Sequence, residues 1–157
     1  MKMSTLSSLF VLLSVVSLIA IAPSAFADVT VKNAPGSEIA GCEPNCFIPS
    51  TATIEVGETV TWDNTDGTAA HTASAGNPTD GPSGVWDSSL IMAGQSYSYT
   101  ADTAGTFDYY CMVHPWMEGT LVVEAAGAAE AAAAADAAAA EAEAAAAIAA
   151  LEAEQAA

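Results

Sequence analysis

Residues 105–119 read Gly-Thr-Phe-Asp-Tyr-Tyr-Cys-Met-Val-His-Pro-Trp-Met-Glu-Gly. Phe107, Tyr109 and Cys111 lie two residues apart, so a strand would place them on one face, and the two aromatic residues indicate that this face points inward. His114 and Met117 follow Cys111 at steps of three residues, and a turn just after the strand could aim all three donors at one point. The stretch therefore predicts a buried strand that brings a thiol, an imidazole and a thioether to one site.

A second histidine completes this set of donors. His71 is the only other histidine of the chain. Two imidazoles, a thiolate and a weak axial thioether suit copper in both oxidation states, because sulfur favours Cu(I) and imidazole binds both. We therefore predict one copper ion held by His71, Cys111, His114 and Met117. Taken singly, a histidine is more often structural and a methionine near a strand end more often a core residue, and this alternative weighs most for Met117.

The same stretch resembles the small blue copper proteins, plastocyanin and amicyanin. The motifs that carry the resemblance are Cys111-x-x-His114-Pro115-x-Met117, residues 105–110 and Trp62-Asp63-Asn64. It spans about residues 29–124, and the short spacing between cysteine and methionine is closer to amicyanin. The resemblance implies an all-β protein, a Greek-key β-sandwich of the cupredoxin fold, with one type 1 copper ion.

The resemblance also implies roles for residues around the metal. The backbone N–H of Thr72 would donate to the sulfur of Cys111, and Asn64 would tie neighbouring loops together, although an ordinary turn residue is an equally good interpretation of Asn64. The edge of His114 would emerge through an apolar patch where partners dock and electrons leave. The candidates for this patch are Met92, Pro115 and Trp116. The alternative is that the tryptophan merely covers the loop.

Short β segments separated by turns make up the rest of residues 28–124. Apolar residues alternate with polar or small ones, which is the period of strands with one buried face in an antiparallel sandwich. The predicted strands lie at residues 29–31, 53–56, 59–62, 96–99, 106–109 and 120–123. Residues 74–87 are rich in Gly, Pro, Asn and Ser, so we predict a long loop that covers one side of the domain.

Two further segments flank this domain. Residues 1–27 combine a positive start, an uncharged apolar core and a small-x-small ending, which indicates an export signal; an uncleaved membrane anchor is the alternative. Residues 125–157 are almost all alanine with scattered Glu and Asp, and we predict a helical or disordered tail that does not span a membrane. The predicted division is signal peptide at 1–27, copper-binding domain at 28–124 and tail at 125–157.

Export determines how the three cysteines are interpreted, because unpaired thiols tend to be oxidised outside the cytoplasm. Cys42 and Cys46 lie close together in a turn-rich segment, so they can form a small disulfide loop and leave Cys111 for the metal. The alternative is that Cys42 and Cys46 bind a second metal or do redox chemistry. No further histidine remains to help such a metal, and the spacing is not the two-residue redox spacing.

Acidic residues dominate the charge of the chain, with 19 Asp and Glu against 2 Lys and Arg. This sign excludes nucleic acid as a partner, because phosphate binding requires basic residues. The excess of acid fits either a basic redox partner or a solvated surface suited to a saline or acidic medium. We favour the second interpretation, because the acids are spread along the chain.

Together these features predict an exported, extracytoplasmic type 1 copper protein that carries single electrons between larger redox proteins. We expect a monomer that is not an enzyme, and contact with a membrane only if residues 1–27 stay uncleaved. Two alternatives remain open. One is a copper site with an open position that reacts with a small molecule such as nitric oxide, and the other is a copper carrier.

Overall fold

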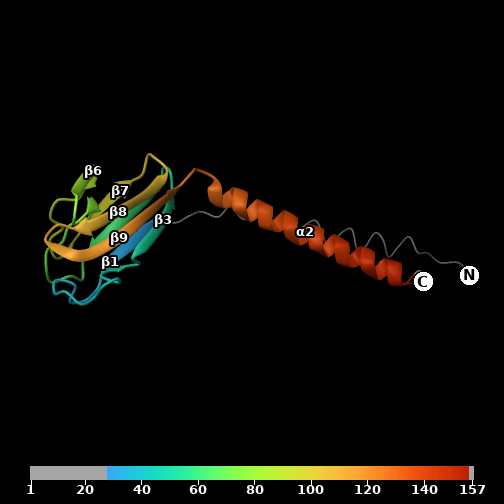
Figure 1. The fold of residues 1–157 in the computed structure, drawn as a ribbon, viewed down its shortest axis with the longest axis horizontal. Helices are drawn as coiled ribbons and strands as arrows, with labels where there is room; N and C mark the ends of the chain where they lie inside the picture. The colour runs from blue at the N-terminus through green and yellow to red at the C-terminus, as the bar shows by residue number, and fades with distance from the viewer. Residues whose placement is uncertain (1–27, 156–157) are drawn as a thin grey trace, which may run out of the picture. The chain divides into compact units, whose positions relative to one another are not determined.

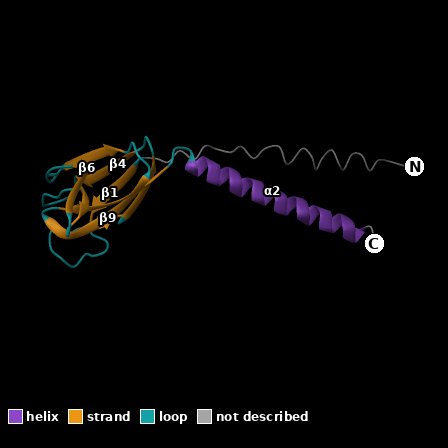
Figure 2. Cartoon of the chain, turned by 45° about the horizontal axis from the view of Figure 1, so that its top comes forward, coloured by secondary structure: helices purple, strands orange, loops and turns teal. Residues whose placement is uncertain are grey.

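The computed structural model describes residues 28–155, and the predicted export signal at 1–27 lies outside them. Contacts divide the described chain into a β domain, residues 28–131, and the remainder of a C-terminal helix, residues 132–155. The strands of the β domain form two sheets (Figure 1). Strands and loops make up residues 28–127, and the helix that follows is drawn in purple in Figure 2.

The two sheets have four and five strands. The first contains, in spatial order, β2 (Phe47–Ile48), β1 (Val29–Asn33), β4 (Thr59–Asn64) and β7 (Gln95–Thr100). The second contains β3 (Thr51–Glu55), β9 (His114–Glu124), β8 (Gly105–Cys111), β5 (Ser74–Asn77) and β6 (Gly81–Asp87). Two neighbouring pairs, β1 with β4 and β3 with β9, are parallel and join strands that are distant in sequence. The chain therefore crosses between the sheets, and the predicted Greek-key β-sandwich is confirmed.

Alternation of side chains accounts for the strands that the sequence predicts. In β4, Val60, Trp62 and Asn64 are buried, and the residues between them are more exposed. The ring of Trp62 lies 5.1 Å from that of Tyr109 on the opposite sheet and 5.7 Å from that of Trp86, measured between ring centroids. These aromatic contacts across the sandwich hold the two inner faces together.

The prediction of a long loop at residues 74–87 is wrong, because this segment forms the antiparallel hairpin of β5 and β6. Its residues are small or polar and only Trp86 of β6 is buried, so no alternation marks the strands. The hairpin depends instead on its turn, in which the side-chain oxygen of Asn77 accepts hydrogen bonds from the backbone of Thr79 and Asp80, each at 2.9 Å. Gly76 is needed because a Cβ there would collide with the carbonyl oxygen of Gly81.

The alanine-rich tail forms the helix α2 (Ala128–Gln155), none of whose residues is buried. Alanine has the highest helix propensity, which favours this conformation without packing. The helix begins beside β3, where the carboxylate of Glu55 accepts hydrogen bonds from the backbone N–H groups of Gly127 (2.7 Å) and Ala129 (2.8 Å). Neither α2 nor any other helix within residues 28–155 combines the length and apolar character that a membrane crossing requires.

Candidate metal centre

Cys111 ends strand β8 with its side chain fully buried, and it is a free thiol. Tyr109 of the same strand is also buried, so the predicted inward face is confirmed. The following strand β9 begins at His114, which pairs with Cys111 across a turn of two residues. The predicted turn after the strand therefore spans only Met112 and Val113, and His114 already belongs to the next strand, which supports its backbone.

His71 reaches the same place from the segment between β4 and β5. Its backbone makes a bridge with Ile91, with N···O distances of 3.1 and 2.8 Å, and its side chain is buried. Asn64, at the end of β4, donates from Nδ2 to the carbonyl oxygens of Ala69 (2.8 Å) and Ile91 (2.9 Å). The predicted role of Asn64 in tying loops together is therefore confirmed.

Three of the four predicted ligands come together in the structure. The Sγ atom of Cys111 lies 3.9 Å from Nδ1 of His71 and 3.6 Å from Nδ1 of His114, and the two Nδ1 atoms are 3.2 Å apart. Bonds of metal to nitrogen and sulfur at roughly 2.0 and 2.3 Å would place trigonal donors roughly 3.5 to 3.8 Å apart. The triangle formed by His71, Cys111 and His114 therefore has the size that one metal ion needs.

Met117 lies on β9, three residues after His114, with its side chain fully buried. It belongs to the same core cluster of buried residues as Cys111. Its thioether therefore lies inside the sandwich, where the Cys111 side chain also lies. Ligation by Met117 stays a prediction.

Hydrogen bonds and burial favour the metal-binding forms of these side chains. The backbone N–H of Thr72 donates to Sγ of Cys111 at 3.2 Å, as predicted, and a donor of this kind stabilises a thiolate. The Thr72 hydroxyl in turn accepts a hydrogen bond from the backbone N–H of Met112 at 2.8 Å, which ties the two ligand segments together. Burial, and then the charge of His114, lower the pKa of His71, with Glu38 acting weakly in the opposite sense. The imidazole therefore keeps a free lone pair near neutral pH.

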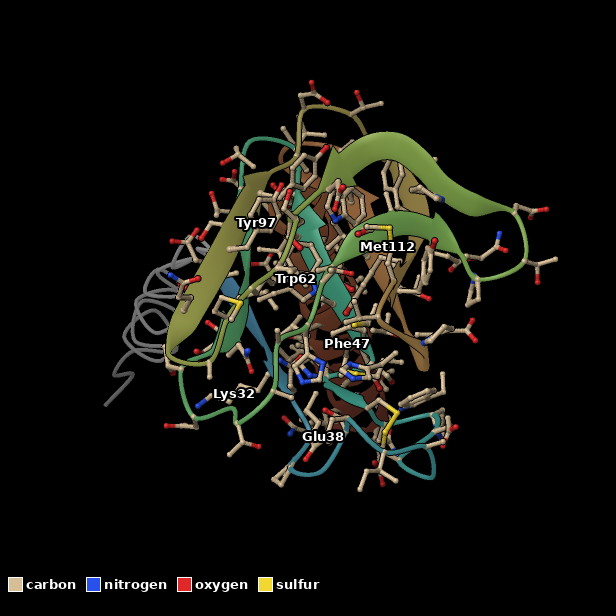
Figure 3. The ribbon with its side chains drawn as sticks, turned by 90° about the vertical axis from the view of Figure 1, so that its left-hand side faces the viewer. Lys32, Glu38, Phe47, Trp62, Tyr97 and Met112 are labelled. Atoms are coloured by element: carbon tan, nitrogen blue, oxygen red, sulfur yellow. A yellow bond between two sulfur atoms is a disulfide. The ribbon has the colours of Figure 1, made fainter. Side chains whose placement is uncertain are left out.

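The ring of His114 is half-buried and lies next to that of Trp116, with centroids 5.3 Å apart. Of the predicted patch residues, Pro115 is exposed, Met92 is 51% exposed and Trp116 is half-buried. Two apolar residues outside the predicted patch are also exposed, Met112 at 38% and Val113 at 47%. Figure 3 views this end of the sandwich, with Lys32 and Glu38 toward the rim and Phe47 and Trp62 further inside.

Trp116 contacts the loop that contains Ser37, and the sequence did not predict this contact. Its indole Nε1 donates to the carbonyl oxygen of Ser37 at 2.9 Å. A backbone carbonyl carries no residue-specific signal, so no motif could have indicated this contact. Cys42 and Cys46 of the same loop form a disulfide, so they offer no thiolates for a second metal.

Comparison with known proteins agrees with this centre. The family of copper binding proteins named plastocyanin/azurin matches residues 42–124. A plastocyanin of Scenedesmus fuscus is 38% identical over 86 residues, which cover 50% of this chain and 86% of that protein. An amicyanin of Paracoccus versutus is 30% identical over 102 residues, which cover 65% of this chain and 73% of the relative.

A solved structure supports the same fold. A purple cupredoxin from Nitrosopumilus maritimus aligns with a TM-score of 0.56 and 24% identity, over 62% of this chain and 100% of that chain. The likeness confirms the cupredoxin fold that the sequence motifs imply. The family match, which covers more than half of the chain, assigns copper as the cofactor. The chain belongs to the plastocyanin/azurin family of copper binding proteins.

Proposed function

We propose that the chain is a type 1 blue copper protein that carries single electrons between larger redox proteins outside the cytoplasm. The observation that carries the proposal is the triangle of His71, Cys111 and His114 donors at the end of the sandwich. In this proposal these three residues would hold the copper ion, and Met117 would be a weaker fourth donor. A thiolate with two imidazoles suits copper that cycles between Cu(I) and Cu(II).

The protein's contribution is a preformed and largely dry site. Copper supplies one-electron redox chemistry when it is bound. Cys111 and His71 are buried, so they are shielded from water, and Thr72 holds the thiolate in place from its backbone. Asn64 and the pairing of Cys111 with His114 fix the two ligand segments. Rigid ligands move little between oxidation states, which lowers the reorganisation that electron transfer must overcome.

The half-buried ring of His114 offers the shortest route from this centre to a partner. Met112 and Val113, which precede it in the turn, and Met92, which follows the partner strand residue of His71, are exposed apolar residues that suit a transient protein contact. The clustered donors are two histidines and one cysteine, and the proposal assigns all three to the copper ion, which leaves none of them free as a general acid or base. A role without catalysis of its own is therefore part of the proposal.

Location and domain organisation are further parts of the proposal. The Cys42–Cys46 disulfide fits an oxidising compartment, which supports export directed by residues 1–27. Residues 28–124 would form the copper-binding domain, and residues 125–157 would form a tail that the metal centre does not use. The partners would be larger redox proteins that donate and accept the electron.

The test is the optical and electron paramagnetic spectrum of the Cu(II) protein, titrated with azide. An intense thiolate-to-copper band with small copper hyperfine splitting, unchanged by azide, is expected for a closed type 1 site. Cys111→Ser should abolish the band. Met117→Leu should change the spectrum, whereas the matched control Met112→Leu on the exposed turn should leave it unchanged. Azide sensitivity in the native protein would overturn the electron carrier in favour of a site that reacts with small molecules.

A further inference from the structure

A closed loop at residues 34–46 lies beside the metal centre. Its ends are joined by the hydrogen bond from the N–H of Ala34 to the carbonyl of Cys46 at 2.8 Å. The Cys42–Cys46 disulfide closes its second half. The family match begins at residue 42, so most of this loop precedes the part of the chain that the family shares. We call residues 34–46 the cystine loop.

The cystine loop contacts Trp116 at two points. The carbonyl of Ser37 accepts the hydrogen bond from the indole Nε1 at 2.9 Å, and Ser37 is 1% exposed. On the backbone side, Sγ of Cys46 lies 3.8 Å from the carbonyl oxygen of Trp116. Because Cys46 is in a disulfide, this second approach is a van der Waals contact without a proton. Both the ring and the backbone of Trp116 are therefore held by the loop.

Trp116 in turn contacts a proposed copper ligand. The centroid of its ring lies 5.3 Å from that of His114, with the planes tilted by 51°. Residues 114 and 116 lie on the same strand, two positions apart, so their side chains share one face of β9. A shift of the indole would therefore be felt by the imidazole beside it.

One flank of the cystine loop borders a pocket of about 420 Å³. Residues 33–38, residues of the 63–68 segment and His71 line this pocket. A loop without packing on this flank depends on its remaining contacts to stay in place. Those contacts include the disulfide and the bond to Trp116.

We propose that the cystine loop positions His114 through Trp116, so that the Cys42–Cys46 disulfide sets the surroundings of a copper ligand that it does not touch. Trp116 is the positioning residue, and the disulfide keeps its partner carbonyl in place. The predicted effect on copper rests on the proposed function, whereas the claim that the cystine loop positions Trp116 does not. Each of these two claims can therefore be tested and rejected by itself.

The first experiment uses the full chain without copper. Cys42→Ser/Cys46→Ser removes the disulfide, and hydrogen exchange of the indole N–H groups is followed by nuclear magnetic resonance. We expect exchange at Trp116 to become about fivefold faster, the factor that corresponds to one net hydrogen bond. Trp86 is the internal control, because its buried Nε1 has no hydrogen-bond partner among the described residues. Unchanged exchange at Trp116 would overturn the proposal.

The second experiment measures the reduction potential and spectrum of the copper-loaded protein. Trp116→Phe keeps an aromatic ring but removes the donor, and we expect the potential to fall, because water that reaches His114 stabilises the more highly charged Cu(II). The double serine variant should shift the potential in the same direction. Combining it with Trp116→Phe should add no further shift, since the disulfide acts through the indole.

Trp86→Phe is the matched control and should leave the potential unchanged. Additive shifts, or no shift with Trp116→Phe, would overturn the coupling to copper even if the indole exchange behaves as expected. If the native chain shows no type 1 spectrum, the proposed function fails and the exchange experiment alone decides whether the loop holds Trp116.

Discussion

Asn64 lies beneath the segment that carries His71 and holds it with its side-chain amide. Besides its two bonds to the carbonyls of Ala69 and Ile91, its Oδ1 accepts a hydrogen bond from Nδ2 of Asn33 at 3.0 Å. The side chain is buried, so water does not replace these partners. The loop that presents His71 is therefore held by a residue outside the proposed ligand set.

Asn64→Ala should lower the free energy of unfolding of the copper-free protein by ~2–4 kcal/mol, because it removes three hydrogen bonds. The carbonyl of Ala69 and Nδ2 of Asn33 lose their partner, whereas the carbonyl of Ile91 keeps the N–H of His71 as a donor. Urea denaturation measures the loss. Asn45→Ala, on the exposed turn of the disulfide loop, is the control and should change stability by less than about 0.5 kcal/mol. Equal effects of the two substitutions would contradict the role given to Asn64.

Gly119 allows the ring of Tyr109 to lie across strand β9. A Cβ at position 119 would collide with the phenol of Tyr109, which is 1% exposed and is confined by Phe47 and Trp62 at 5.0 and 5.1 Å between centroids. Gly119→Ala should therefore destabilise the protein by ~1–3 kcal/mol through overpacking, measured by thermal unfolding. When Tyr109→Leu is combined with Gly119→Ala, the total loss of stability should be smaller than the sum of the losses of the two single variants. Strictly additive losses would argue against the steric cause.

The proposed ligands could be predicted from the sequence because three of them fall within seven residues and the chain offers a single further histidine. The inward direction of Cys111 followed from the period of a strand. The contact of Trp116 with Ser37 could not be predicted, because it joins residues 79 positions apart through a backbone atom. The types and spacing of residues are enough to predict the proposed ligands. The contacts that keep those ligands in position are visible only in the tertiary structure.

At the scale of elements, burial explains which strands the sequence could reveal. Strand β4 alternates strictly between buried and more exposed residues, so its pattern is visible. Strand β6 lies at the edge of the second sheet and buries only Trp86, so its pattern resembles that of a loop. The hairpin of β5 and β6 forms through backbone pairing and the Asn77 turn, neither of which leaves a period in the sequence.

The start of α2 depends on the carboxylate of Glu55. Hydrogen bonds from the backbone of Ala129 and Gly127 lower the pKa of this carboxyl. Because the pKa in the folded state is depressed, the stabilising contact is present above the unfolded value and is lost as the pH falls through the folded value. The backbone amide resonance of Gly127 should therefore shift on acidification as Glu55 takes up its proton.

Glu55→Gln should remove that acid-dependent shift and reduce the helical circular dichroism signal at neutral pH, because a neutral amide is a weaker acceptor at a helix N-terminus. Glu130→Gln, in the first turn of α2, is the control. It should retain the Gly127 shift. If Glu55→Gln leaves both the shift and the helix signal intact, Glu55 does not cap the helix.

Across the whole molecule, negative charge is nearly unopposed, with a formal net charge of −17. In the register of the parallel strands β3 and β9, Glu55 is even paired with Glu124. Sodium chloride should therefore raise the thermal midpoint of the copper-free protein, because the Debye length falls from about 10 Å at 0.1 M to about 3 Å at 1 M. Glu124→Gln should reduce this dependence on salt. A midpoint that falls with salt would show that repulsion does not limit stability.

Lys32 is the single lysine or arginine of residues 28–155, and it sits within β1, which pairs with β2 on one side and β4 on the other. Its ammonium group lies 3.6 and 3.4 Å from the carboxylates of Asp63 and Asp66. Trypsin cleaves after basic residues and needs an extended chain free of other strands. The intact fold should therefore resist this protease. The rate of cleavage after Lys32 would then report how often the first sheet opens.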